Sequence, residues 1–304
     1  MKKIVDVTIG IVTYNRVEAL KKCLNSILNL SVYPAKIIIF DNGQDRAERI
    51  ISNYRFLPIE YIYKEERVPM TFSRNRILEK TKTPIIAFID DDTELSVDWL
   101  KNLFDAYQKC DKKKIAGITG PAINCDKAGN PLEKIIKVDK NLNFFTKWGD
   151  PRYEGKRWVP SKQIQCDFMI GCNMSFFTEL IKKSGGFDEQ LFNPSFREDS
   201  DASAKLFKIG YRFIYDPGVY LKHFPNMDGG ITDVERTNNY FYLAGKNHRR
   251  FVDKYFPKYL TRLAWVFWSK NPPSLILSLF LTIFRKRNYF YWHKGLWEDV
   301  LYFF

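Results

Sequence analysis

Three consecutive carboxylates follow one strongly apolar stretch of the chain. Pro84 is followed by five apolar residues, 85–89, and then by Asp90, Asp91 and Asp92. An unbroken apolar run of this kind is typical of a strand buried on both faces, in a sheet covered by helices. Ligands of such sheets bind beyond the C-terminal ends of the strands. Clustered carboxylates at that position need a cation or another counter-charge, because they repel one another and lose hydration.

The acidic residues after this strand have two explanations. Oxygen ligands suit Mg²⁺ or Mn²⁺, which usually bridge to the phosphates of a substrate. Alternatively, they form a structural turn in which Asp92 or Thr93 caps the next helix. A second acidic cluster, Glu198, Asp199 and Asp201, opens a helical pattern, where carboxylates interact favourably with the helix dipole. Residue types alone leave both explanations open.

The composition is that of a folded protein. The chain has 304 residues, of which 45% are hydrophobic and 27% charged, enough for one large domain or two small ones. A strand pattern begins soon after Met1, without the apolar segment or cleavage site of a signal peptide. The five cysteines form no CxxC pair and are odd in number, which predicts reduced thiols and a cytoplasmic location.

The net charge of +13 limits the classes of partner. Basic proteins bind nucleic acid, anionic membranes or phosphorylated ligands. Much of the excess lies near the C-terminus and is interleaved with aromatic residues, as at 246–250 and 285–287. This distribution favours a membrane surface over a nucleic-acid groove, so we expect no nucleic-acid partner.

Strand and helix patterns alternate along the first half of the chain. Strands are expected at residues 6–14, 36–40, 59–63, 85–89 and 115–123, and helices at about 20–28, 71–80 and 99–107. This order predicts an α/β fold, a Rossmann-like, doubly wound, mostly parallel sheet with helices on both faces. Polar residues follow three of the strands: Thr13, Tyr14 and Asn15, then Asp41 and Asn42, then the three aspartates. Because parallel strands end at one edge, these side chains should converge on one crevice.

The second half is less regular. Residues 124–165 show no regular hydrophobic periodicity, which predicts a long excursion from the sheet, a loop region that contains a small hairpin. Further expected elements are a strand at 166–177, a helix opened by 197–201, short strands at 211–215 and 219–223, and a long helix at 232–256.

The last part of the chain, residues 257–304, is aromatic and basic. Its longest apolar run, 274–284, is shorter than the roughly 20 residues that span a bilayer. A basic triplet follows at 285–287, and four tryptophans surround the run. This pattern predicts a helix in the membrane interface. The alternative is that these aromatic residues pack back onto the rest of the protein.

The order of these elements resembles the inverting GT-A glycosyltransferases of family 2. Six segments carry the resemblance: Val-Thr-Tyr-Asn-Arg at 12–16, Phe-Asp-Asn-Gly at 40–43, Ser-Arg-Asn-Arg at 73–76, Phe-Ile-Asp-Asp-Asp at 88–92, Gly-Gly-Phe-Asp-Glu at 185–189 and Arg-Glu-Asp-Ser-Asp at 197–201. Each is weak alone, but all six occur in the family's order and spacing. The tail, with 247–250 and 294–296, loosely resembles rhamnosyltransferase-like members. Ser73 departs from the family pattern, which commonly has alanine there.

The resemblance implies a transferase that moves a hexosyl or deoxyhexosyl group from a UDP-, GDP- or dTDP-sugar to a glycan or lipid-linked acceptor, with Mn²⁺ or Mg²⁺. It implies a GT-A catalytic domain at 1–230, with a donor half at 1–123 and an acceptor half at 124–230, and a helical extension at 231–304. With the tail, it implies an enzyme peripheral on the cytoplasmic membrane face.

The resemblance also assigns roles to individual residues. Asp199 matches the general base. The residues implied to bind the nucleotide sugar are Thr13, Tyr14, Asn15, Arg16, Asp41, Arg74, Asp90 and Asp91. Asp90 and Asp92 match the ends of the family's DxD metal motif, and His223 matches a position that supplies another metal ligand in some members. A lone histidine is often structural, so both roles of His223 stay open.

Two other classes of protein compete with this interpretation. A nucleotidyltransferase also places carboxylates and Mg²⁺ at a sheet edge, but it normally has a glycine-rich loop after the first strand, and residues 14–17 contain no glycine. A non-catalytic, basic membrane- or nucleic-acid-binding protein would not need both Asp92 and Asp199. Release of nucleoside diphosphate from a nucleotide sugar separates the enzyme from a binding protein.

Overall fold

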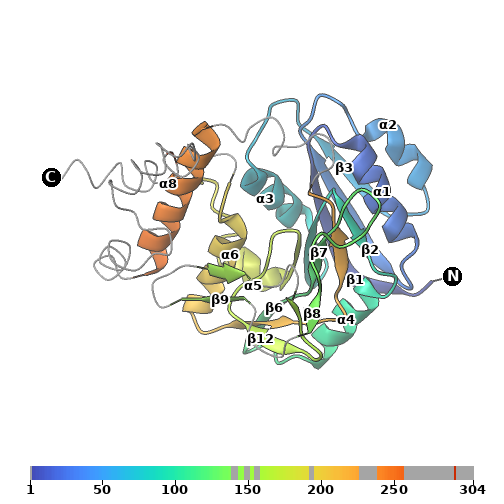
Figure 1. The fold of residues 1–304 in the computed structure, drawn as a ribbon. Coiled ribbons are helices and arrows are strands. Elements are labelled where there is room, and N and C mark those ends of the chain that lie inside the picture. Colours follow the sequence, from blue (N-terminus) through green and yellow to red (C-terminus); the bar gives the residue numbers. More distant parts are fainter. Residues whose placement is uncertain are drawn as a thin grey trace.

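The structure, a computed structural model, describes residues 2–137, 143–146, 151–153, 158–191, 195–225, 238–256 and 291. Its centre is an eight-stranded sheet in the order β12-β14-β6-β13-β4-β1-β2-β3 (Figure 1). The strands are β1 (Ile4–Thr13), β2 (Tyr33–Asp41), β3 (Ile59–Tyr63), β4 (Ile85–Asp90), β6 (Ile115–Thr119), β12 (Ile164–Cys166), β13 (Asn173–Phe177) and β14 (Arg212–Tyr215). Strands β3, β2, β1 and β4 are parallel, as are β6 and β14. Only β13 and β12 run against their neighbours in this sheet. The predicted α/β fold with a mostly parallel sheet is confirmed.

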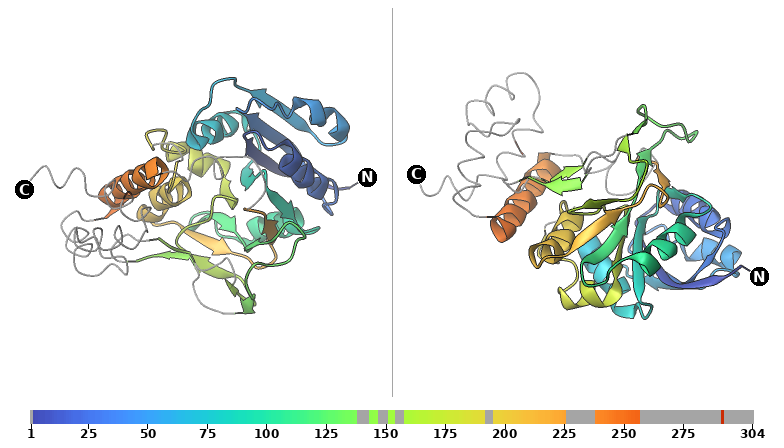
Figure 2. Two further views of the ribbon diagram at one scale, coloured as in Figure 1. Left: turned by 45° about the horizontal axis from the view of Figure 1, so that its top comes forward. Right: turned by 90° about the horizontal axis from the view of Figure 1, so that it is seen from below.

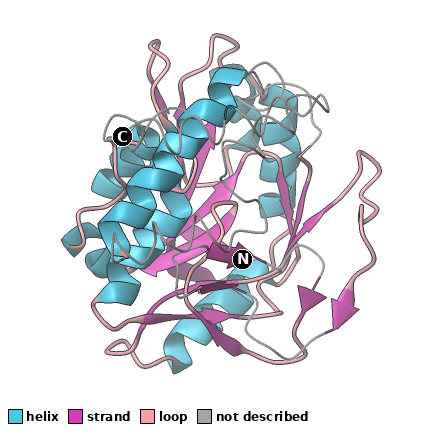
Figure 3. Ribbon diagram, turned by 60° about the vertical axis from the view of Figure 1, so that its left-hand side comes forward, coloured by secondary structure: helices cyan, strands magenta, loops and turns pink. Residues whose placement is uncertain are grey.

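Helices cover both faces of this sheet, as Figure 3 shows. They are α1 (Val17–Leu28), α2 (Glu48–Ile51), α3 (Met70–Lys80), α4 (Trp99–Lys109), α5 (Thr178–Lys183) and α6 (Glu198–Lys208), with a 3₁₀ turn at Ser52–Tyr54. Successive residues of a strand point to opposite faces. Ile85, Ala87 and Ile89 of β4 therefore pack with α1 and α4, whereas Ile86 and Phe88 pack with α3, α5 and α6. The absence of polar residues at 85–89 follows from these two buried faces.

Within the described residues, three smaller sheets lie outside the central one. A three-stranded sheet joins β5 (Thr93–Leu95), β15 (Leu221–His223) and β7 (Ala122–Asn124), with β15 in the middle. The excursion at 124–165 contains an antiparallel pair, β9 (Asn143–Phe145) with β10 (Pro151–Tyr153), which confirms the expected hairpin. It also contains a short parallel pair, β8 (Ile136–Lys137) with β11 (Trp158–Val159).

Two predicted strands were wrong as single elements. Residues 115–123 split into β6 and β7, which belong to different sheets. Pro121 has no N–H to continue the ladder, and a Cβ on Gly120 would lie 2.1 Å from the backbone oxygen of Val219. Of residues 166–177, Cys166 ends β12 and Asn173–Phe177 form β13, because the chain turns between Ile170 and Asn173.

A further helix, α8 (Asn238–Tyr255), packs beside α6 at one end of the molecule (Figures 1 and 2). It is the described part of the helix predicted at 232–256. Phe251, Val252 and Phe256 form a buried cluster with Ala204 of α6. Phe145 of β9 joins it, with its ring centroid 5.9 Å from that of Phe251. Through this cluster, the first described helix of the predicted C-terminal extension packs against α6 and β9.

The interfacial helix predicted within 257–304 lies outside the described residues, of which this stretch holds only Tyr291. Among the helices that the structure describes, none has both the length and the apolar character needed to cross a membrane.

The packing of α8 can be tested by shortening one side chain. Phe251→Ala should lower the free energy of unfolding by about 3–5 kcal/mol, because Phe251 is fully buried and its loss leaves a cavity. Urea denaturation followed by circular dichroism measures this change. The same substitution at Phe56, which is 88% exposed, should change stability by less than about 0.5 kcal/mol. An equally small effect at Phe251 would show that α8 is not packed on α6 in solution.

Candidate active site

The polar ends of β1, β2 and β4 meet at one edge of the sheet. The strands are parallel neighbours, and their register pairs Thr13 with Asp41 and Val12 with Asp90. Thr13 Oγ1 donates a hydrogen bond to Asp91 Oδ2 over 2.7 Å. Residues that are far apart in the sequence therefore form one polar crevice, as their positions at the strand ends predicted.

A largely buried guanidinium, that of Arg16, faces two of the aspartates. Its Nη1 lies 2.7 Å from Asp92 Oδ2 and 3.4 Å from Asp91 Oδ1. Burial raises the pKa of Asp91 to about 7, and the charge of Asp92 adds to this shift. Burial also disfavours the Asp92 anion, but the neighbouring His223 imidazole, together with Arg16, outweighs it and holds the pKa of Asp92 below its ordinary value. The pKa values of these two neighbouring carboxyls are thus shifted in opposite directions.

The small sheet carries His223 to the same point. Pairing of β15 with β5 and β7 sets His223 between Thr93 and Asn124. His223 Nδ1 lies 2.9 Å from Asn124 Oδ1, an oxygen that only accepts, so Nδ1 carries a proton. His223 Nε2 lies 3.4 Å from Asp92 Oδ1. The imidazole is therefore held with Nε2 toward the aspartates.

The residues at this point fit a divalent cation. Asp92 Oδ1 is buried and has no hydrogen-bond partner, which leaves its lone pairs available beside His223. Asp90, Cys172 and His223 each offer a ligand atom, and these atoms lie within 4.8 Å of one another. Carboxylate oxygen and imidazole nitrogen are ordinary ligands of Mn²⁺ and related ions.

A second buried cation, Arg74 of α3, connects the aspartates to α6. Its Nη2 lies 3.2 Å from Asp90 Oδ1 and donates to the Gly171 carbonyl over 3.1 Å. Its Nη1 forms an ion pair with Glu198. Burial raises the pKa of Asp90 even though Arg74 opposes this shift. A Cβ on Gly171 would lie 2.8 Å from Glu198 Oε1, so a larger residue at this position would have to displace the Glu198 carboxyl.

Asp199 lies next to this ion pair at the first turn of α6. Its Oδ2 accepts from the Gly171 N–H over 3.1 Å, and its Oδ1 accepts from the Ser200 N–H over 2.6 Å. Arg197, just before the helix, has a left-handed backbone with φ of +77°. Its Nε donates to Nδ1 of the buried His248 in α8 over 3.1 Å. Burial, with the charge of Arg197, lowers the pKa of His248 far below its ordinary value, so this histidine is neutral.

The loop after β2 is organised by Asp41. One carboxylate oxygen accepts from the Gly43 N–H, and the other accepts from the Ala47 N–H and the Tyr61 hydroxyl, all within 2.7–2.8 Å. Asn15, with φ of +52°, accepts from a backbone N–H of the same loop. Asn15 and Asp41 therefore shape the crevice wall, and neither is among the residues lining its two cavities.

Two cavities open at the crevice. The first, about 240 Å³, is lined by Val12, Thr13, Tyr14, Arg16, Asn42, Arg67, Val68, Met70, Asp90, Asp91, Asp92, His223 and Pro225. The second, about 540 Å³, includes Arg74, Glu198, Asp199 and Cys172, with an aromatic group formed by Tyr153, Phe168, Phe196 and Tyr240. Asp90 and His223 line both cavities. The candidate metal ligands thus stand where the two spaces meet.

Comparison with known families identifies this arrangement. The model of the family described as "Glycosyl transferase family 2" matches residues 8–185, more than half of the chain. The chain belongs to glycosyl transferase family 2. The resemblance expected from the sequence motifs is confirmed for this family. The matched region includes most of β1, all of β2 and β4, and Arg74, whereas α6 and Asp199 follow it.

Two relatives and one solved structure illustrate the similarity of this family 2 chain. O-antigen chain rhamnosyltransferase RfbN of Salmonella typhimurium is 26% identical over 238 residues, 77% of this chain and 70% of the relative. Pre-mycofactocin glycosyltransferase of Mycobacterium tuberculosis is 22% identical over 222 residues, 72% of this chain and 42% of the relative. The chain thus spans less than half of the latter's length. The structure of GalNAc-T7 with UDP, GalNAc and Mn²⁺ aligns with a TM-score of 0.66 and 16% identity, over 97% of this chain and 56% of that one. This likeness supports the predicted GT-A fold.

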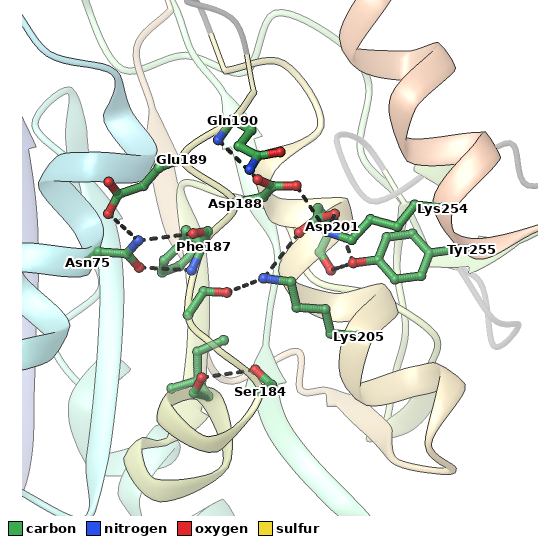
Figure 4. Close-up of polar contacts among 12 residues, drawn as sticks. Asn75, Ser184, Phe187, Asp188, Glu189, Gln190, Asp201, Lys205, Lys254 and Tyr255 are labelled. Carbon is green, nitrogen blue, oxygen red and sulfur yellow. Dashed lines mark hydrogen bonds and ion pairs between the residues drawn. The ribbon is translucent and has the colours of Figure 1, made fainter.

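Asp201, another acidic residue of the segment 197–201, lies away from the cavities. Figure 4 shows it within a network that joins α6 to α8. Asp201 Oδ1 lies 2.9 Å from Lys254 Nζ and accepts from the Tyr255 hydroxyl over 2.8 Å. Lys254 Nζ also reaches Asp188 Oδ2 over 3.0 Å. Asp201 and Asp188 therefore hold α8 in place.

The structure adds residues that the sequence did not single out for this family 2 site. Cys172 and the Gly171 amide both face the group around Asp90. Gly171 gave one usable signal, a glycine inside an apolar stretch, which often marks close approach of another group. Arg67 lies 5.0 Å from the ring centroid of Tyr14 in the first cavity. A lone cysteine and one arginine among many carry no such signal.

Glu198 should make stability depend on pH. Burial raises its pKa to about 8 although Arg74 opposes the shift, whereas in the unfolded chain it titrates near its ordinary value of about 4.3. The folded state then binds more protons between these values, so this stabilising contribution is complete below about pH 4 and is lost as the pH rises to about 8.

Glu198→Gln should therefore make the fall in unfolding free energy between pH 5 and 8 shallower. Asp91, whose pKa is raised to about 7, supplies part of the slope that remains. Urea denaturation across this range, with chelator present, measures it. Glu65→Gln, at an exposed position, should keep the wild-type slope. An unchanged slope in Glu198→Gln would contradict the raised pKa.

Proposed function

We propose that this chain is an inverting, metal-assisted glycosyltransferase. It transfers a sugar, of the hexosyl or deoxyhexosyl class, from a nucleotide-sugar donor to a hydroxyl of a glycan or lipid-linked acceptor. Family membership supports glycosyl transfer, and the structural neighbour with UDP, GalNAc and Mn²⁺ supports the donor class. The observation that carries the proposal is the meeting of two cavities at Asp90 and His223, with Asp199 on the wall of the second.

The first cavity receives the nucleotide in this proposal. Tyr14 and Arg67 offer a flat, cationic wall for a base, because a guanidinium packs on aromatic faces. Thr13 and Arg16 hold Asp91 and Asp92 in place, and Arg16 lies near enough to the crevice to face a phosphate. Asn15 and Asp41 shape the loops around the base, and a direct contact of Asp41 with the base remains a prediction.

The metal ligands are proposed to be Asp90, Asp92 and His223. When bound, Mn²⁺ or Mg²⁺ supplies positive charge that offsets the charge developing on the departing diphosphate. Asp92 Oδ1 has no other hydrogen-bond partner, and the Asn124 contact keeps His223 Nε2 directed toward it. Arg74 holds the Asp90 carboxylate from the opposite direction.

Asp199 is proposed to take the proton of the acceptor hydroxyl. Its carboxylate is oriented by the Gly171 and Ser200 amides, and it borders the cavity that lies beyond Asp90. The neighbouring carboxylates are less suited to this role: Glu198 is paired with Arg74, and Asp201 is bound by Lys254 and Tyr255. A base on the side away from the leaving group gives inversion at the anomeric carbon.

The second cavity is proposed to hold a glycan acceptor. Tyr153, Phe168, Phe196 and Tyr240 line it. Aromatic rings offer apolar faces, and the C–H faces of sugar rings pack against such surfaces. The polar residues Asp199 and Arg74 stand at the end nearest Asp90, where a hydroxyl must be oriented.

Asp199→Asn should separate catalysis from donor binding. Loss of a general base lowers kcat by about 10²–10⁴-fold, whereas affinity for the nucleotide should stay close to that of the wild type. A thermal-shift screen of UDP, GDP and dTDP with Mn²⁺ selects the nucleotide. Turnover of the matching nucleotide sugars is then followed by release of nucleoside diphosphate, and affinity is measured by calorimetry.

Asp105→Asn, at a partly exposed position outside both cavities, serves as the matched control and should keep full turnover. Unchanged kcat in Asp199→Asn would remove Asp199 as the base. No thermal shift with any of the three nucleotides would count against the donor assignment itself.

The C-terminal residues 257–304 are proposed to hold the enzyme at an anionic membrane surface, where a lipid-linked acceptor is available. The proposal depends on the sequence pattern of a short apolar run, a basic triplet and four tryptophans. Each basic residue near such a surface contributes about 1 kcal/mol, and salt weakens this contribution.

Full-length protein should therefore sediment with anionic liposomes, less so at high salt, and truncation after residue 256 should largely abolish binding. Replacing Arg285, Lys286 and Arg287 by glutamine should weaken binding while the apolar run stays intact. Full-length protein that remains in the supernatant would favour packing of the tail onto the protein.

A further inference from the structure

Cys172 lies beside the proposed metal ligands because of the strand register. The antiparallel pairing of β13 with β4 sets Asn173 opposite Ile89, so the preceding Cys172 comes level with Asp90. The Cys172 thiol, an Asp90 oxygen and an imidazole nitrogen of His223 lie within 4.8 Å of one another. All three residues are partly exposed and line the second cavity.

We propose that Cys172 gives this site a thiolate ligand, so that Asp90, Cys172 and His223 together bind Zn²⁺. The inference concerns the site of the proposed function, but metal binding is measured without a nucleotide sugar or acceptor. Zn²⁺ takes sulfur, nitrogen and oxygen ligands in tetrahedral sites, and three protein ligands leave a fourth position open. Binding converts the Cys172 thiol to a thiolate and releases its proton to solvent.

The surroundings of the three ligands suit a bound cation. Asn124 accepts from His223 Nδ1, which fixes the neutral tautomer whose Nε2 carries the lone pair that can coordinate. Arg74 holds Asp90 through Oδ1, so its other oxygen is available. Asp92 is 4% exposed, and its Oδ1, which has no hydrogen-bond partner, lies 3.4 Å from His223 Nε2. This buried oxygen independently points to a cation at the same place.

The thiolate changes which ion the site prefers. Sulfur favours Zn²⁺ over Mg²⁺ and Mn²⁺, which are bound mainly by oxygen. The proposed Mn²⁺ ligands and the Zn²⁺ ligands share Asp90 and His223, so the two ions cannot occupy the site together. Zn²⁺ should therefore displace Mn²⁺ at this point between the two cavities.

Co²⁺ is a suitable probe, because thiolate coordination gives a charge-transfer absorption that oxygen and nitrogen ligands alone do not give. Metal-free, full-length protein in a non-thiol reductant is titrated with CoCl₂. The absorption should appear in the wild type and in Cys110→Ser, which removes another partly exposed thiol. It should be absent in Cys172→Ser, and Zn²⁺ should abolish it in the wild type. Competition titration should show Zn²⁺ affinity lowered by roughly tenfold or more in Cys172→Ser.

A second measurement needs no variant of the site. Iodoacetamide labelling, read by mass spectrometry, should show that Zn²⁺ protects Cys172 and leaves Cys110 labelled. The proposal is overturned by a wild type without the absorption, by its persistence in Cys172→Ser, or by labelling of Cys172 unaffected by Zn²⁺. If the Zn²⁺ proposal is overturned in this way but the protein still binds a nucleotide with Mn²⁺, the proposed function stands. If the Co²⁺–thiolate absorption appears but no nucleotide binds, only the metal site is supported.

Discussion

Carboxylates gathered at a sheet edge that excludes much water are stable only if cations are built in beside them. Arg74 meets this requirement for Asp90, and for Glu198 in its ionised form, and its side chain is 2% exposed. The rings of Phe88 and Phe187 lie 5.7 and 5.6 Å from its guanidinium carbon, so the cation is enclosed by apolar surface as well as by its partners. Removing one member of a buried ion pair leaves an uncompensated charge, which costs about 3–5 kcal/mol. The position of α6 against α3 therefore depends on this guanidinium, and so does the Asp199 that α6 carries.

The reversed direction of β13 provides the second half of the site. β13 lies between β4 and β6 and is antiparallel to both. The turn that leads into it consequently arrives beside the C-terminal end of β4, where Gly171 accepts from Arg74 and donates to Asp199. A parallel strand at this place would deliver its preceding loop to the opposite edge. The second cavity next to the aspartates thus follows from one change of strand direction.

Much of the fold could be predicted from the sequence, because the buried parallel strands are continuous apolar runs. The edge carrying Thr13, Asp41 and Asp90 followed from strand order, since parallel neighbours end together. The small sheet that carries His223 could not be predicted in the same way. Its strands come from three distant segments, and the apolar pattern of 115–123 does not reveal that the chain leaves the main sheet at Gly120 and Pro121. Cys172 was missed for a related reason: its neighbour Asp90 is set by long-range register, and nothing local distinguishes it from a buried structural cysteine.

The link between α6 and α8 bears on how the predicted domains act together. The boundary predicted near residue 230 would separate the catalytic region from the extension in sequence, yet α8 is joined to the helix that carries Asp199 at two places. Near the N-terminus of α6, neutral His248 accepts from Arg197, whose left-handed backbone starts the turn into the helix. One turn further, Lys254 and Tyr255 hold Asp201. These contacts lie on both sides of Asp199 in the sequence. A displacement of α8 would therefore also shift the helix turn that orients the proposed base. The first helix of the extension is in this sense part of the site, even though its polar contacts serve position and not chemistry.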